Sequence, residues 1–339
     1  MLAGNALSET ALPALDVRAA ARRLAVPAVV VGVAVVCVFL AGGGVHTLLE
    51  RLRRALDISP TWVVAAAGLE AMSLTGYVAL LSLVAGRATP RIGIRASASI
   101  TLAGAAATRL LPTAGAGGAA LTLWALRRAG LERKVAARTL LTFLVVLYSV
   151  FLAAIVASGS TLAFGLSRAR GPVELGAILA VAALFAITLC LALARGRDGA
   201  LARPARLHAT ARLLGDAVGD GCRLVRSRDP RLVGAIGYWL FDAAVVWAML
   251  HAFGASSAVP VVALAYFVGQ VANTLPLPGS VSGGIAGVLI AFHVPAAPAV
   301  AAVLAYRTVA IWLPLPVALA AVPRLRATVS RWTHEGAAT

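Results

Sequence analysis

Charged side chains are scarce in this chain. Only 13% of its 339 residues are Asp, Glu, Lys or Arg, whereas soluble globular domains carry about 25%. A protein that faces water on all sides needs more charge than this. The composition therefore argues against a soluble enzyme or a soluble binding domain.

The residues that build most catalytic and metal sites are also few. Cys37 and Cys190 lie in apolar segments and Cys222 lies in a basic one, so their spacing predicts neither a disulfide framework nor a zinc site. The five histidines are scattered, and the sequence has no HExxH, P-loop or GxSxG motif. We expect neither a metal ion nor a cofactor, and a non-enzymatic role is favoured over catalysis.

Apolar side chains, in contrast, make up 60% of the chain. A helix that crosses a bilayer needs about 20 apolar residues, and six segments meet this length. They are 24–45, 60–86, 136–158, 172–194, 232–253 and 298–323. The first exceeds the roughly 7–15 apolar residues of a signal peptide, so we expect it to be retained. The predicted fold is an all-α polytopic membrane protein with one transmembrane domain over 24–325.

Two further apolar regions, 96–130 and 260–293, are interrupted by proline and glycine at 111–118 and 275–284. Proline lacks a backbone N–H and disfavours helix at the preceding residue, and glycine permits the turn that follows. Each flanking piece has about 11 to 16 residues, which is too short to cross a membrane. We therefore predict two re-entrant helical hairpins, whose turns face an interior cavity because irregular backbone inside a membrane needs protein or water partners.

The cations follow the predicted spans. Arginine outnumbers lysine 29 to 1 and the net charge is +17, which alone would suggest nucleic-acid binding. With the N-terminus in the cytoplasm, however, 23 of the 30 cations fall in inside segments and five fall outside, as the positive-inside rule requires. We predict a multi-pass protein of the cytoplasmic (inner) membrane, with 1–23 and 326–339 in the cytoplasm and no nucleic-acid partner.

The two halves of the chain resemble each other. The turn at Leu111-Pro112 matches that at Leu275-Pro276, and residues 135–139 match 304–308, at offsets of 164 and 169 residues. Repeat A (24–158) and repeat B (172–323) would each contain two spans, a hairpin and a third span. Three crossings reverse the direction, so the repeat would be inverted, as in many transporters. Chance similarity between helices of small residues is the alternative.

Ionisable residues inside the apolar segments are the first candidate site. A charge at the bilayer centre costs about 2.5–3.5 kcal/mol. The candidates are Glu70, Arg109, Arg138, Asp242 and Arg307. As functional residues, the arginines would hold an anionic headgroup, because a guanidinium group binds phosphate through two parallel hydrogen bonds. The carboxylates would pair with the arginines or with a cationic group. As structural residues, all five would form ion pairs that join helices.

The glycine-rich turns are the second candidate site. A helix that starts after each turn offers free N–H groups and partial positive charge to an anion. Small residues let a headgroup approach the backbone, and polar side chains add hydrogen bonds. The residues predicted on this basis are Gly115, Gly117, Gly118, Asn273, Gly279, Ser280, Ser282, Gly283 and Gly284. The alternative is that they only permit a bend and close helix contact.

The segment 195–231 carries nine arginines and four aspartates and is amphipathic between 207 and 225. It is interpreted as a cytoplasmic loop that sets the orientation of the protein. A segment lying on the anionic membrane surface is the alternative.

Three motifs resemble a known family. They are 108–112 with Gly117-Gly118, 273–279 with Gly283-Gly284, and 305–307 followed by 311–314. Here the chain resembles, over roughly 24–325, the transmembrane region of lysylphosphatidylglycerol synthases, also called flippase-like integral membrane proteins. The resemblance implies a module that moves aminoacylated or otherwise modified lipids between leaflets, or one tied to glycolipid assembly.

The chain departs from that family in two ways. Its members usually carry an acidic residue shortly after each glycine turn, but 119–121 and 285–288 contain none. About 15 residues follow the last predicted span, so we expect a membrane module without the aminoacyl-transferase domain and without lysyl transfer.

The leading hypothesis is a translocator of a membrane phospholipid or lipid-linked intermediate that binds an anionic headgroup between the two hairpins. One alternative is a membrane transferase that acts on polyprenyl-phosphate-linked sugars, with Glu50 and Asp57 as candidate acids. Another is a non-catalytic partner of a separate membrane or cytoplasmic enzyme.

Overall fold

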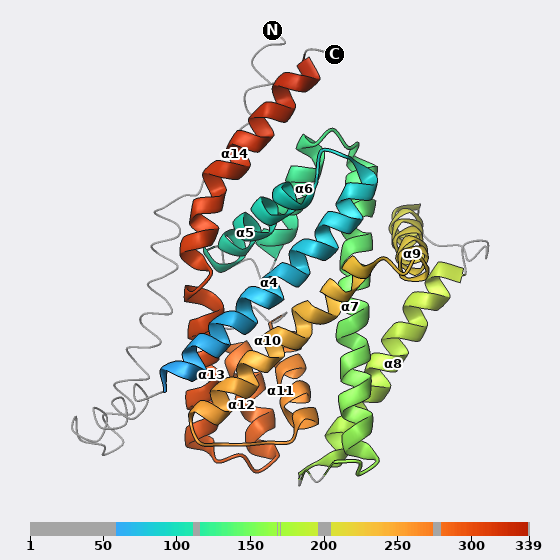
Figure 1. Cartoon of the computed structure of the whole chain (residues 1–339). Helices are drawn as coiled ribbons and strands as arrows, with labels where there is room; N and C mark the ends of the chain where they lie inside the picture. The colour runs from blue at the N-terminus through green and yellow to red at the C-terminus, as the bar shows by residue number, and fades with distance from the viewer. Residues whose placement is uncertain are drawn as a thin grey trace. The chain divides into compact units, whose positions relative to one another are not determined.

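The computed structural model describes residues 59–110, 116–167, 169, 171–195, 205–273 and 279–337. The described part of the chain is helical and contains no β-strand (Figure 1). Five of its helical segments are long and apolar enough to cross a membrane. The prediction of an all-α polytopic membrane protein is therefore confirmed. The predicted span 24–45 and the candidate acids Glu50 and Asp57 lie outside the described residues.

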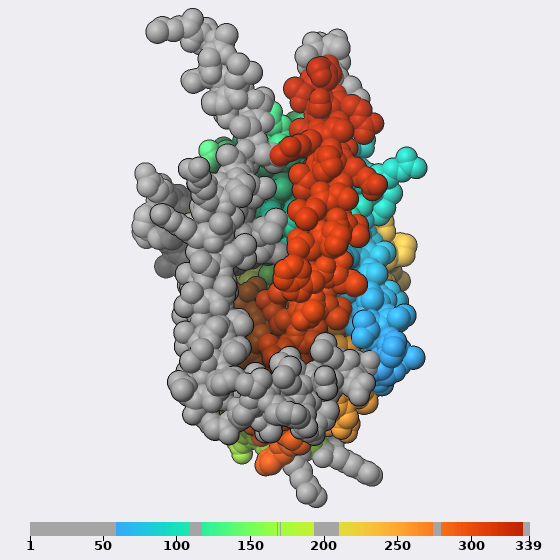
Figure 2. All heavy atoms as spheres, turned by 90° about the vertical axis from the view of Figure 1, so that its left-hand side faces the viewer, coloured from blue at the N-terminus to red at the C-terminus, as the bar shows by residue number. Residues whose placement is uncertain are grey.

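The long helices coincide with predicted spans. They are α4 (Pro60–Ala88), α7 (Arg133–Ala163), α8 (Val173–Arg195), α10 (Val233–Ala252), and α13 (Ala296–Trp312) followed by α14 (Leu315–Ala337). The helix continues beyond the last predicted span, through most of the predicted tail 326–339. Leu325, Val329 and Trp332 give that end of α14 a buried apolar face at helical spacing. Figure 2 shows α14 in red along one face of the molecule.

Two pairs of shorter helices occupy the two interrupted regions. They are α5 (Ile94–Leu110) with α6 (Ala116–Arg128), and α11 (Val259–Ala272) with α12 (Ser280–Ala291). With 14 and 12 residues, α11 and α12 are about 21 and 18 Å long, shorter than the roughly 30 Å hydrocarbon core. Residues 111–115 and 274–278, which hold most of the predicted breaks, lie outside the described residues.

Glycines bring the helices of each short pair into backbone contact. A Cβ atom on Gly118 would lie 3.3 Å from the Gly104 carbonyl oxygen, and one on Gly284 would lie 2.9 Å from the Gly269 Cα. In addition, the Gly118 N–H donates to the Thr108 hydroxyl at 2.9 Å. Larger residues at these crossings would push the helices apart. Gly104 and Gly269 are 165 residues apart in the sequence, and Gly118 and Gly284 are 166 apart.

The crossing of α4 and α10 is also close. A Cβ atom on Gly76 would lie 2.5 Å from the Gly234 carbonyl oxygen. Next to this contact, the Ser73 hydroxyl donates to the Tyr238 carbonyl oxygen at 2.8 Å, between residues 165 apart in the sequence. A sequence offset of 165 or 166 residues therefore relates contact residues at the α4–α10 crossing and corresponding glycines of the α5–α6 and α11–α12 pairs.

The basic segment contains α9 (Ala205–Arg226), followed by the short 3₁₀ helix η2 (Pro230–Leu232). Ala217, Val218 and Leu224 are buried, and Gly221 faces Val145 and Val146 of α7. The region 195–231 therefore contains a helix at 205–226, which includes the stretch predicted to be amphipathic. Described residues of its apolar face therefore pack against protein.

Arginine side chains gather where α4 ends and α10 begins. Arg87, in the last turn of α4, donates to the Ser227 hydroxyl at 3.0 Å and lies 3.9 Å from Asp229. Arg231 makes two hydrogen bonds to Asp229, which lowers the pKa of that carboxyl to about 2. We call this region, with the ends of α6 and α14 and the start of α7, the basic end.

Candidate functional site

Asp242 is the centre of a buried polar group that joins three of the described helices. It is the tenth of the 20 residues of α10, and 9% of its surface is exposed. The Tyr266 hydroxyl of α11 donates to Asp242 Oδ2 at 2.5 Å, and the Tyr306 hydroxyl of α13 donates to the same oxygen at 3.3 Å. Side chains from three helices therefore meet at one carboxylate in the middle of a membrane-spanning helix.

Gln270 extends this group. Its Nε2 atom donates to the Tyr306 hydroxyl oxygen at 3.3 Å. Tyr266 and Gln270 are four residues apart on α11, so they lie on one face of that helix. We call Asp242, Tyr266, Gln270 and Tyr306 the Asp242 cluster.

Two further predicted site residues lie in the same region. Glu70 of α4 is 4% exposed, and Arg307 follows Tyr306 on α13. The helices α4, α10 and α13 contact one another. Arg307 is half-buried and makes no hydrogen bond or ion pair in the described part of the chain. The structure thus brings together Glu70, Asp242 and Arg307, which the sequence placed in three separate spans.

An aromatic network surrounds the Asp242 cluster and includes all five tyrosines of the chain. Trp239 is its hub, and the Trp239 indole N–H donates to the Leu147 carbonyl oxygen at 2.8 Å. The ring centroid distances are 5.2 Å for Tyr77–Tyr238, 4.7 Å for Tyr238–Trp239, 5.8 Å for Tyr148–Trp239, 6.3 Å for Trp239–Tyr266 and 6.3 Å for Tyr266–Tyr306. Edge-to-face contacts at these distances are favourable, so the network fixes the positions of the hydroxyl groups.

Arg138 is not part of this region. It lies near the start of α7, where its Nε and Nη2 atoms donate to the Asp220 carboxylate at 2.5 and 2.8 Å. Asp216 is 3.8 Å away. Arg138 and Val84 of α4 line one cavity. Glu70 lies 14 residues before Val84 on α4, which is about 21 Å along the helix. Arg138 therefore forms an ion pair that joins α7 to α9, and its predicted role in substrate binding stays a prediction.

The electrostatics of this pair are those of an interfacial ion pair. Burial raises the pKa of Asp220, but the hydrogen bonds and charges of Arg138 and Arg223 outweigh burial and lower the pKa overall. The carboxylate is therefore ionised throughout the physiological pH range.

The predicted glycine site is divided in the structure. Gly118 and Gly284 face the partner helix of their pair, which is the packing role left open from the sequence. Gly279 has a left-handed conformation (φ 80°) at the start of α12, and Gly283 has open space around its Cα.

The remaining predicted residues near the two turns do not form a single group. Gly117 is buried, Ser280 and Ser282 are half-buried, and Asn273 is exposed where α11 ends. Gly115 and the side chain of Arg109 lie outside the described residues.

Three members of the Asp242 cluster were not predicted as site residues: Tyr266, Gln270 and Tyr306. A signal was present in the sequence. A tyrosine hydroxyl in an apolar helix needs a hydrogen-bond partner, and only a few acidic residues lie within the apolar spans. Pairing the tyrosines with Asp242 would have required knowing which helices are neighbours.

Residues 25–318 match the family described as the lysylphosphatidylglycerol synthase TM region. This chain belongs to that family. A search of curated proteins returned no match. The family match covers the Asp242 cluster and both short helix pairs, and it ends within α14. The lysylphosphatidylglycerol synthase TM region is an integral membrane domain, in agreement with the five apolar spans.

Proposed function

We propose that this chain moves a lipid or a lipid-linked intermediate between the leaflets of the cytoplasmic membrane. The observation that carries the proposal is the Asp242 cluster, a carboxylate with two tyrosine partners at the middle of α10. Ionisable residues at this depth are costly, at about 2.5–3.5 kcal/mol each. Their presence on α4, α10 and α13 favours a polar ligand that passes through this region.

The residues have complementary roles in this proposal. Arg307, which is half-buried and has no carboxylate partner among the described residues, holds the phosphate of a headgroup. Asp242 and Glu70 balance that charge or hold a cationic group of the same headgroup, and the tyrosine hydroxyls orient the carboxylate. The acyl chains stay in the surrounding lipid.

The helix pairs supply the framework. We place α5–α6 and α11–α12 as re-entrant hairpins that enter from opposite faces of the membrane, with the basic end in the cytoplasm. The recurring 165-residue offset supports an inverted repeat. In an inverted repeat, equivalent residues of the two halves are related by a pseudo-two-fold axis, and such residues touch only near that axis. Ser73 and Tyr238 are 165 residues apart and in contact, so the axis would pass close to them. Inverted repeats with broken helices are a transporter architecture.

The energy for translocation must come from a gradient in this proposal. The sequence has no P-loop for a nucleotide, so an ion gradient, the membrane potential or the lipid gradient drives transport. Moving one elementary charge through the membrane potential is worth about 2.3 kcal/mol per 100 mV.

The test is translocation of fluorescent phospholipids in proteoliposomes. Arg307→Ala is expected to lower the initial rate at least tenfold, because the phosphate loses its cation, whereas Arg326→Ala, an exposed arginine of α14, is the matched control and is expected to stay within twofold. Equal thermal unfolding of the variants shows that the fold is retained. Translocation at the wild-type rate by both Arg307→Ala and Arg109→Ala would contradict the proposed site.

A further inference from the structure

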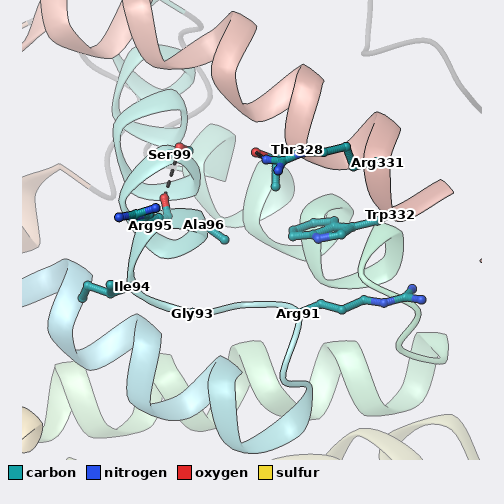
Figure 3. Close-up of a pocket in the computed structure, with 9 residues that line it drawn as sticks. All are labelled: Arg91, Gly93, Ile94, Arg95, Ala96, Ser99, Thr328, Arg331 and Trp332. Atoms are coloured by element: carbon teal, nitrogen blue, oxygen red, sulfur yellow. Dashed lines mark hydrogen bonds between the residues drawn. The ribbon is translucent and has the colours of Figure 1, made fainter. Parts of the chain in front are cut away.

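A polar cavity lies at the basic end, away from the Asp242 cluster. It measures about 450 Å³ and is formed by the start of α5, the segment before it and the end of α14. Figure 3 shows its lining, with Arg331 and Trp332 of α14 on one side and the backbone at Arg91 and Gly93 on the other. We call this cavity the α5–α14 pocket. Its α14 residues lie beyond the part of the chain that matches the family.

The pocket is strongly positive. Arg91, Arg95 and Arg331 line it, and no acidic residue does. None of these three arginines makes an ion pair within the described residues. In contrast, Arg87, Arg138, Arg223 and Arg231 at the same end are each paired with an aspartate. Other arginines, such as Arg326, also lack an ion pair within the described residues, but Arg91, Arg95 and Arg331 are brought together around one cavity.

The other groups around the pocket suit a phosphoryl group. The α5 helix of 17 residues begins here with no acidic residue in its first turn, so its free N–H groups add positive potential. Ser99 and Thr328 supply hydroxyl groups, and Arg331 donates to the Thr328 hydroxyl at 3.4 Å. Two kinds of donor, guanidinium and backbone N–H, thus meet around one cavity.

The apolar part of the lining indicates a site at the membrane surface. Trp332 is 6% exposed and forms one wall, and Ile94 on the rim is 56% exposed. Tryptophan is enriched at membrane–water interfaces, where one part of its surroundings is apolar and the other wet. In Figure 3 the side chains of Arg91 and Arg95 extend toward opposite sides of the view. Its volume of about 450 Å³ leaves room for a headgroup larger than one phosphate ion.

We infer that the α5–α14 pocket binds a phosphate-bearing anion, which is either the headgroup of an anionic phospholipid or a free phosphate compound. Arg331, held by Thr328, and Arg95 are the residues that would contact the phosphoryl oxygens. The inference does not depend on translocation through the Asp242 region, because it concerns a separate cavity at the membrane surface.

The test uses the purified full-length chain and measures binding alone. In one arm, radiolabelled inorganic phosphate is titrated onto the protein in detergent. In the other arm, native mass spectrometry counts retained phosphatidylglycerol, with phosphatidylcholine as the reference lipid. The variants are the double change Arg95→Gln with Arg331→Gln, and the matched control Arg326→Gln on the same helix.

The expected result is that the double variant binds the phosphate-bearing ligand at least tenfold more weakly, while Arg326→Gln binds within twofold of the wild type. The affinity should also fall as NaCl is raised, because exposed charges are screened. Retention of phosphatidylglycerol that free phosphate displaces identifies the lipid as the source, whereas binding of phosphate without lipid retention identifies a free phosphate compound.

Equal binding of both probes by the wild type and the double variant would overturn the inference. Because Arg95 and Arg331 are exposed and have no ion-pair partner among the described residues, the double variant should fold, and its thermal unfolding checks this. Loss of translocation in Arg307→Ala with phosphate binding intact would concern only the Asp242 region, so the two proposals fail separately.

Discussion

Asp242 and Asp220 are both carboxylates on helices of this membrane protein, but their surroundings differ. Asp242 is 9% exposed and accepts hydrogen bonds from two tyrosine hydroxyls. The Asp220 side chain is 24% exposed and accepts from the guanidinium groups of Arg138 and Arg223. The carboxylate at the basic end is paired with arginines and joins helices. The interior carboxylate of Asp242 has hydroxyl partners instead of cations, so a charge on it remains energetically unfavourable. For this reason we favour a functional role for Asp242.

The largest expected difference is in transport. Asp242→Asn keeps the shape of the side chain and removes its charge, so we expect the translocation rate in proteoliposomes to fall at least tenfold. Asp220→Asn is the matched change at the other carboxylate and should leave the rate within about threefold. If the two variants lose activity equally, the distinction between a functional and a structural carboxylate is lost.

The next difference concerns the helix pair α11–α12, which carries Tyr266. Gly269→Ala would place a methyl group 2.9 Å from the Val281 carbonyl oxygen and against the Ile285 side chain. Overpacking of this kind costs about 1–3 kcal/mol and should weaken the Tyr266 contact with Asp242. Gly287→Ala, with open space around Gly287, is the control and should be neutral or slightly stabilising. Denaturant unfolding in detergent measures both, and equal midpoints would show that the α11–α12 contact is looser than described.

Single hydroxyl deletions test the cluster itself. Tyr266→Phe removes the 2.5 Å hydrogen bond to Asp242 and should lower the free energy of unfolding by about 1.5–3 kcal/mol, as for hydrogen bonds to charged groups. Tyr306→Phe removes a contact of 3.3 Å and should cost less. A larger loss for Tyr306→Phe than for Tyr266→Phe would reverse the order that the distances predict.

The smallest effect is expected at the ion pair. Asp220→Asn should lower the free energy of unfolding by about 1 kcal/mol or less, since both side chains are partly exposed. The pKa of Asp220 is lowered in the folded protein, so its stabilisation is present above the unfolded pKa of about 3.9. That stabilisation is lost as the pH falls through the lower folded value. Comparing the unfolding of wild type and variant from pH 6 to pH 3 measures this, and a difference that grows on acidification would contradict the assignment.

Much of the fold could be predicted from the sequence because membrane helices have strong local signals. The segments 60–86, 136–158 and 232–253 agree with α4, α7 and α10 to within a few residues, since length and apolarity alone define a span. The end of α14 could not be predicted this way, because Leu325, Val329 and Trp332 form a narrow apolar stripe among arginines.

The candidate site was predictable only in part. Charge inside an apolar span singled out Glu70, Asp242 and Arg307, which the structure brings together. Arg138 was paired with Arg307 by sequence similarity, but Arg138 is the sixth residue of α7 whereas Arg307 is the twelfth of α13. Its aspartate partners lie on α9, 82 residues away in the case of Asp220, and no local pattern reveals contacts at that separation.

The junction of α13 and α14 has a mechanical consequence. Tyr306 and Trp332 stand on consecutive helices, 26 residues apart, about 39 Å along a continuous helix. Pro314 at the junction and Pro323 within α14 lack the backbone N–H that would make a helical hydrogen bond. The two helices therefore bend most easily at these positions. Bending at these two prolines would displace Trp332, and with it one wall of the α5–α14 pocket, more than Tyr306, which precedes both prolines.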